Sequence, residues 1–119
     1  IRLSLVGSEM CIRDRSTTIG DVAEINAIQK VFTDNDVKIS STKSLTGHSL
    51  GATGAQEIIF SLLMMNNNFI SPSINLENVI EEADGLNIIT DQNDISFNSF
   101  MSNSFGFGGT NSCLIFEKD

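Results

Sequence analysis

Apolar residues recur every three or four positions in two stretches of the chain, and this spacing places them on one face of a helix. In residues 19–32 the repeated positions are Val22, Ile25, Ile28 and Phe32. In residues 50–65 they are Ala52, Ala55, Ile58, Ile59, Leu62 and Met65. The second apolar face is wide, so we expect most of that helix to be buried. The asparagines at 66–68 should end it.

Shorter apolar runs, bounded by turn residues, predict strands around the two helices. The expected strands are residues 37–41, 86–90, 95–103 and 112–117, with an extended segment at 69–74. Loops or turns fall at 33–36 and 78–85, and a Gly-rich bend at 105–110 joins the last two strands. Helices and strands mix without an internal repeat, so the predicted class is α/β or α+β.

A shift in charge divides the chain near residue 15. All three arginines, Arg2, Arg13 and Arg15, lie in the first fifteen residues. The chain carries −8 and this segment +1, so the remainder carries −9. Residues 1–15 (IRLSLVGSEMCIRDR) also resemble translated sequencing-adaptor DNA. We therefore predict a non-native segment at 1–15, leave it out of the fold reasoning, and place the domain at 16–119.

Composition excludes several classes of function. The negative charge disfavours a nucleic-acid or anionic-membrane partner, since both attract a basic face. The longest apolar run, residues 58–65, is too short for a membrane span. Cys11 and Cys113 show no metal-ligand spacing and fit a reducing compartment, so we expect a cytoplasmic protein. Cys113 lies in a predicted strand, where we expect a buried structural cysteine rather than a nucleophile.

Residues 42–51 (TKSLTGHSLG) hold the only histidine, His48, with Lys43 five positions before it. One interpretation is a helix start capped by Ser49, with a surface lysine. The other is a neutral His48, because a helix N-terminus disfavours positive charge nearby. Such an imidazole donates one hydrogen bond and accepts another, most simply from a backbone N–H of residues 49–51.

Two further features could carry chemistry. The Gly-rich bend is followed by a strand-like run rather than a helix, so a phosphate-binding loop is excluded there. It is either a turn with core phenylalanines or an apolar gate beside a substrate. Glu57 lies within the second predicted helix and is by default solvated. If buried, it needs a cation or donors such as Ser102 and Asn103.

Two motifs together resemble the β-ketoacyl-acyl-carrier-protein synthases. The first is residues 42–52 with Gln56 and Glu57, and the second is residues 102–111 (SNSFGFGGTN). Residues 69–75 and 85–90 are most similar to the bacterial type I enzymes of that family. The resemblance covers residues 16–119 and implies a C-terminal fragment of an acyltransferase.

The resemblance implies an α/β, thiolase-like fold, of which this chain is part of the C-terminal half. The complete enzyme is a layered α-β-α-β-α molecule and usually a homodimer. It performs a decarboxylative Claisen condensation with acyl carrier protein as its partner, on substrates carried by phosphopantetheine, and has no cofactor of its own. A structural monovalent cation is a feature of some members.

The resemblance also assigns roles to individual residues. His48 corresponds to the second catalytic histidine, Lys43 to a lysine that supports the histidines, and the Phe107 N–H to half of an oxyanion hole. Substrate-binding positions are Thr17, Phe105, Gly106, Gly108 and Gly109. Asp21 and Glu24 correspond to a supporting acidic network, and Glu57, Ser102 and Asn103 to the cation site.

Two departures from the family pattern limit the expected activity. Ser16 and Thr17 resemble the end of the segment that carries the first histidine, but Arg15 precedes them. The nucleophilic cysteine belongs to the other half of the enzyme. We therefore expect the chain alone to be inactive. The alternatives are a polyketide-type ketosynthase, a non-catalytic partner subunit of the same fold, or a small binding module.

Overall fold

The protein is described by a computed structural model, which defines residues 2–6, 9–10, 18–32, 37–74, 85–91, 94–105 and 108–119. The strands are β1 (Arg2–Val6), β2 (Glu9–Met10), β3 (Lys38–Ser40), β4 (Asn87–Ile88), β5 (Ser99–Phe105) and β6 (Asn111–Glu117). The helices are α1 (Thr18–Val31), α2 (Lys43–Thr46) and α3 (Thr53–Asn67), with a 3₁₀ turn at Leu50–Ala52. The α/β class is confirmed. Among the described residues, no helix is long and apolar enough to cross a membrane.

The strands form one mixed sheet in the order β2-β3-β1-β5-β6, and β4 also pairs with β3. β5 and β6 form an antiparallel pair, with Ser99 opposite Glu117 and Phe105 opposite Asn111. β3 pairs in parallel with β4, with Ile39 opposite Ile88. Strands that are distant in sequence therefore meet at β3, directly before the segment with Lys43 and His48.

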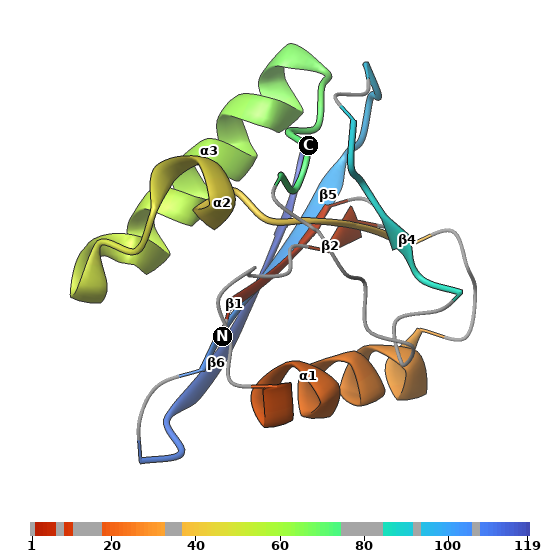
Figure 1. The fold of residues 1–119 in the computed structure, drawn as a ribbon. Helices are drawn as coiled ribbons and strands as arrows, with labels where there is room; N and C mark the ends of the chain where they lie inside the picture. The colour runs from red at the N-terminus through yellow and green to blue at the C-terminus, as the bar shows by residue number, and fades with distance from the viewer. Residues whose placement is uncertain are drawn as a thin grey trace.

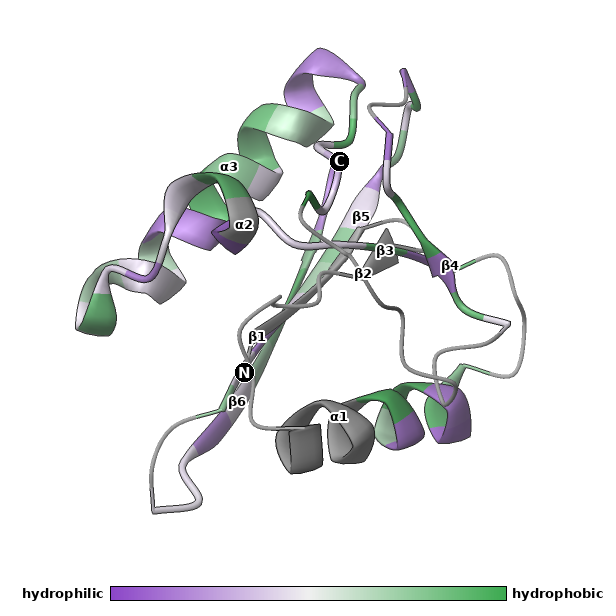
Figure 2. Ribbon diagram, in the orientation of Figure 1, coloured by the Kyte–Doolittle hydropathy of each residue, from purple (hydrophilic) through white to green (hydrophobic). Residues whose placement is uncertain are grey.

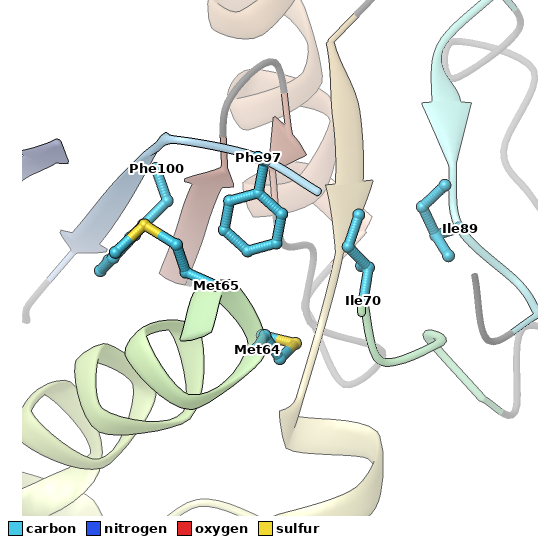
Figure 3. Packing of buried hydrophobic residues seen from close by; sticks show 6 residues of the cluster. All are labelled: Met64, Met65, Ile70, Ile89, Phe97 and Phe100. Atoms are coloured by element: carbon cyan, nitrogen blue, oxygen red, sulfur yellow. The ribbon is translucent and has the colours of Figure 1, made fainter. Parts of the chain in front are cut away.

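Helices cover the two faces of this sheet (Figure 1). On one face, Ile25 and Ile28 of α1 pack against Val37 and Ile39, as the three- and four-residue spacing predicts. On the other face, α3 contributes to a cluster of six buried residues, Met64, Met65, Ile70, Ile89, Phe97 and Phe100, shown in Figure 3. Alternation along β5 sends Phe100 to one cluster and Met101 to the other, so β5 is shared by both.

The prediction for the face of α3 is partly wrong. Ala52, Ala55 and Ile59 are exposed, and Ile58 and Leu62 are half-buried. The buried positions of the helix are Thr53, Glu57, Ser61, Met64 and Met65. The first three lie four residues apart and form one stripe. Glu57 in this buried polar stripe forms an ion pair, and apolar residues of α3 such as Ile59 are exposed. Figure 2 shows hydrophilic and hydrophobic residues mixed along α3.

The N-terminal segment has a place in the fold that the sequence analysis did not give it. β1 lies between β3 and β5, with Leu5 opposite Ile39 on one side and opposite Met101 on the other. The alternating pattern of residues 2–6 is compatible with such a strand. The adaptor-like origin of residues 1–15 is a separate question and stays a prediction.

Candidate functional site

The site begins where β3 ends and the chain turns into α2. The backbone N–H of Ser41 donates to Ser73 Oγ at 2.6 Å, and Ser40 Oγ donates to the Ser71 carbonyl. Ser40 and Ser41, at the end of β3, are both buried. These bonds fasten the end of β3 to the extended segment after α3. Lys43, two residues after Ser41, is the first residue of α2. These bonds therefore also hold the start of α2 in place.

Lys43 and Glu57 form a buried ion pair between α2 and α3. Lys43 Nζ contacts Glu57 Oε1, and their side chains are 4% and 7% exposed. The expectation that Glu57 is solvated, and the interpretation of Lys43 as a surface lysine, are both wrong. The alternative for Glu57 is confirmed, because a buried carboxylate needs a cation nearby, and here the cation is Lys43.

A glycine turn carries the chain from α2 to His48. α2 ends at Thr46 and is capped by Gly47, whose φ of 73° and ψ of −170° lie in a region open essentially to glycine alone. The Gly47 N–H donates to the Lys43 carbonyl at 2.9 Å. The next residue, His48, is exposed. The segment thus places an exposed imidazole a few residues from a buried ammonium group.

The His48 ring is held by a hydroxyl group of α3. Nδ1 of His48 lies 2.7 Å from Thr53 Oγ1, and the same Oγ1 donates to the Leu50 carbonyl at 2.8 Å. Thr53 is 2% exposed. The predicted ring contact was a backbone N–H of residues 49–51, whereas the structure has a side-chain hydroxyl. Ser49 stands at the cap position, but its side chain makes no capping hydrogen bond, so that prediction is wrong.

Thr53 is the residue of this candidate site that sequence reasoning missed. Its position five residues after His48 gave no helical signal, because Leu50–Ala52 form a 3₁₀ turn rather than part of α3. Leu50 adopts a φ of 51° in this turn, which is uncommon for a residue with a Cβ. The turn brings the Thr53 hydroxyl within hydrogen-bond distance of His48 Nδ1.

The three residues of the predicted cation site are all buried. Ser102 and Asn103 lie on β5 and are buried, as Glu57 is on α3. The contact described for Glu57 is with Lys43. Among the described residues, no group of three or more His, Cys, Asp or Glu side chains could hold a metal ion. A cation bound through hydroxyl and amide oxygens stays a prediction.

The Gly-rich bend returns β5 into β6, as predicted. Gly108 and Gly109 have φ values of 80° and 83°, which glycine adopts without strain. Phe105, at the end of β5, is 39% exposed. A strand follows the bend, as predicted. The exclusion of a phosphate-binding loop stays a prediction.

Several predicted site residues lie outside the described residues or lack a described side chain. Thr17, Gly106 and Phe107 belong to the first group. Asp21 and Glu24 lie within α1, but their side chains are not described. Their assigned roles stay predictions.

Cys113 lies within β6 as predicted, but it is exposed, so the expectation of a buried cysteine is wrong. β6 pairs only with β5 among the described strands, and all its residues except Phe116 are exposed. Partial burial nevertheless raises the pKa of the Cys113 thiol by desolvation. A raised pKa disfavours the thiolate, in agreement with the expectation that Cys113 is not the nucleophile.

An apolar pocket of about 190 Å³ lies beside the site, between α2 and α3. Its lining residues are Thr42, Leu45, Thr46, Phe60, Leu63, Met64, Phe69 and Ser71. None of the four residues Lys43, His48, Thr53 and Glu57 lines it, so this pocket is distinct from the polar site.

Comparison with known proteins matches the chain to one enzyme family. The sequence profile described as "Beta-ketoacyl synthase, C-terminal domain" matches residues 11–77. Escherichia coli (strain K12) 3-oxoacyl-[acyl-carrier-protein] synthase 1 is 56% identical over 103 residues, which are 87% of this chain and 25% of that protein. The Haemophilus influenzae synthase 1 is 55% identical over 108 residues, or 90% of this chain and 27% of that protein.

A more distant relative carries a related name. Staphylococcus aureus (strain COL) 3-oxoacyl-[acyl-carrier-protein] synthase 2 is 43% identical over 106 residues, or 87% of this chain and 25% of that protein. The chain thus spans about a quarter of the length of these curated relatives.

Proposed function

Because the chain belongs to the β-ketoacyl synthase C-terminal domain family, we propose that it is the C-terminal part of an enzyme that elongates fatty acids. The relatives named 3-oxoacyl-[acyl-carrier-protein] synthase support this choice over a polyketide-type ketosynthase or a binding module. The complete enzyme is then a cytoplasmic homodimer with five layers, and acyl carrier protein is its partner.

The proposed reaction is a decarboxylative Claisen condensation. A cysteine thiolate outside this chain holds the acyl group as a thioester. Malonyl-carrier protein loses CO2, and the electron pair of the broken carbon–carbon bond forms a thioester enolate. The enolate carbon attacks the acyl carbonyl, and the cysteine thiolate leaves. The 119 residues alone lack that cysteine and the first histidine, so we expect them to be inactive.

His48 is proposed to stabilise the enolate by donating a hydrogen bond to the thioester oxygen. Nδ1 contacts Thr53, so this donation uses Nε2. A donor aimed at developing negative charge is worth about 3 kcal/mol. The observation that carries the proposal is this exposed ring, fixed at one nitrogen by a buried hydroxyl.

Lys43 is proposed to act on His48 through its charge rather than by contact with substrate. Its side chain is buried and paired with Glu57. Burial lowers the effective dielectric, which lengthens the reach of both charges. We propose further that Phe107 supplies an oxyanion-hole N–H, and that Thr17 contacts the phosphopantetheine arm.

A chimera tests the proposal without depending on the fragment. Residues 18–119 replace the aligned quarter of the E. coli synthase 1, which supplies the rest of the enzyme. Condensation of acyl and malonyl thioesters and release of CO2 are then measured. We expect an active chimera, and we expect His48→Ala to lower kcat by about 10²- to 10³-fold.

The matched control is Lys30→Ala, at an exposed position in the last turn of α1. It should leave kcat within about twofold. A folded, active chimera that keeps its rate of CO2 release after His48→Ala would contradict the proposed role.

A further inference from the structure

The hydrogen-bond ladder between β3 and β4 is interrupted by a serine from the segment after α3. The two strands are parallel, and the Ile89 N–H donates to the Ile39 carbonyl at 2.7 Å. In a parallel ladder the next bond runs from the Ser41 N–H to the Ile89 carbonyl. Here that carbonyl accepts the Ser73 N–H at 2.8 Å instead, and the Ser41 N–H donates to Ser73 Oγ at 2.6 Å. Ser73 thus lies between the two strands where they separate.

Both partners of the bond between Ser41 and Ser73 are buried, each with 2% of its surface exposed. A buried backbone N–H needs an acceptor, and a hydroxyl oxygen can accept it whichever way its own hydrogen points. The backbone around Ser73 is itself restrained, because the ring of Pro72 fixes its φ and the Ser71 carbonyl accepts Ser40 Oγ. The Ser73 hydroxyl is therefore presented to the end of β3 from a fixed position.

We propose that Ser73 is a positioning residue for Lys43, and through it for His48, in the condensation reaction. α2 has four residues and is too short to keep its place by itself. Its start is held by the bond from Ser41 to Ser73, and the side chain of Lys43 is held by Glu57. The inference deepens the proposed function and rests on it, because that function is what gives Lys43 a part in the rate.

The path from the end of β3 to His48 is short. Thr42, at the N-cap of α2, makes no side-chain capping bond, so the bond at Ser41 is the nearest described anchor before the helix. The Gly47 N–H donates to the Lys43 carbonyl at 2.9 Å, and His48 follows directly. A shift at Ser41 therefore moves the Lys43 ammonium group and the turn that carries the imidazole. A displacement of about 1 Å in a positioned group can lower a rate by about 10²-fold.

The first measurement is the kinetics of Ser73→Ala in the chimera described above. The substitution removes the acceptor of the Ser41 N–H. We expect kcat to fall by about 10- to 100-fold and KM to stay within about twofold, because neither Ser73 nor Lys43 contacts substrate in the proposed reaction. Both constants are measured well below the thermal midpoint of each variant, where all of the protein is folded, so that lost stability alone leaves them unchanged.

Two further variants separate the hydroxyl from the bulk of the side chain. Ser73→Thr keeps the hydroxyl, and Ser73→Val replaces it with a methyl group of similar size. The added bulk is the same in both, so their comparison holds even if the extra methyl group disturbs packing. We expect kcat of Ser73→Thr to exceed that of Ser73→Val by about tenfold or more.

The matched control is Ser61→Ala. It also removes a buried serine hydroxyl, but that hydroxyl donates to the Glu57 carbonyl within α3 and joins no two elements. Its kcat should stay within about twofold of the unsubstituted chimera.

Amide hydrogen exchange reports the bond at Ser41 without turnover. In the folded chimera, Ser73→Ala should speed exchange of the Ser41 N–H by about tenfold or more. The Ile89 N–H, one bond earlier in the ladder, should stay protected in both proteins. Unchanged exchange at Ser41 in Ser73→Ala would overturn the proposal, and so would equal kcat values for Ser73→Thr and Ser73→Val.

These outcomes are distinct from a failure of the proposed function. A loss of kcat in His48→Ala but not in Ser73→Ala would overturn the inference and leave the proposed function standing. A loss in Ser73→Ala but not in His48→Ala would contradict the role of His48 and leave Lys43 as the group that Ser73 positions.

Discussion

At the scale of single residues, the backbone conformation of the turn before His48 restricts which residues fit there more than the surrounding side chains do. Gly47 and Gly51 flank the histidine, and neither would bring an added Cβ within 4 Å of another atom. They differ in conformation, since only Gly47 has a positive φ, of 73°. The space around the two glycines therefore predicts equal tolerance to alanine, whereas the backbone predicts a difference.

Gly47→Ala should destabilise the protein by about 1–3 kcal/mol, because a Cβ strains this region of backbone conformation. Gly51→Ala is the matched control and should change stability by less than about 0.5 kcal/mol. Both changes are measured by denaturant unfolding. Equal effects of the two substitutions would show that the conformation of Gly47 is not what holds the turn.

At the scale of elements, one ion pair fixes how α2 and α3 meet. α2 has only four residues, Lys43–Thr46, and is too short to be stable by itself. The pair ties its first residue to the second turn of α3, and Ser61 Oγ donates to the Glu57 carbonyl at 2.8 Å. The rotation of α3 is thus set by a polar stripe rather than by its most apolar face.

Lys43→Met should destabilise the protein by about 3–5 kcal/mol, because it removes the ammonium partner of the buried Glu57 carboxylate. Adding Glu57→Leu removes that charge, so the double variant should recover most of the stability. Lys30→Met, at an exposed lysine, is the control and should change little.

Denaturant unfolding of the unsubstituted protein, Lys43→Met, Glu57→Leu and the double variant closes a double-mutant cycle. If the double variant is no more stable than Lys43→Met, the cost comes from lost packing rather than from the lost ion pair. In the chimera, a stable double variant that stays inactive would separate the electrostatic role of Lys43 from its structural role.

At the scale of the whole molecule, the sheet depends on a strand of the N-terminal segment. Five residues of β1 pair with β5, from Arg2 opposite Ser104 to Val6 opposite Phe100, and two pair with β3. Without β1, neighbouring edges of β3 and β5 would present unpaired backbone groups. Exposed apolar residues on α3 and β6, among them Ile59, Leu63 and Ile115, add uncovered surface.

Deleting residues 1–15 from the chain should lower its thermal midpoint and promote association, because it exposes the edges of β3 and β5. Thermal unfolding and size-exclusion chromatography measure the two effects. The intact chain is the reference. A monomeric deletion variant with an unchanged midpoint would show that β1 contributes nothing to the sheet.

The sequence predicted the buried face of some elements and not of others, for physical reasons. α1 was predicted well, because the spacing of Ile25 and Ile28 by itself marks the buried face. The face of α3 was not, because local periodicity cannot show that Glu57 has a cation on another helix. Thr53 escaped notice for a similar reason: its role depends on a 3₁₀ turn and the positive φ of Leu50.

By itself, the sequence determined the α/β class, both long helices, the β5–β6 hairpin around its glycines and the family motif with Lys43 and His48. These follow from residue spacing, turn chemistry and motif, which are local properties of the chain. Only the tertiary structure decided that Glu57 is buried with Lys43, that Cys113 is exposed and that a hydroxyl holds the His48 ring. Each of these depends on which elements lie against one another, and burial and pairing exist only once those elements have met.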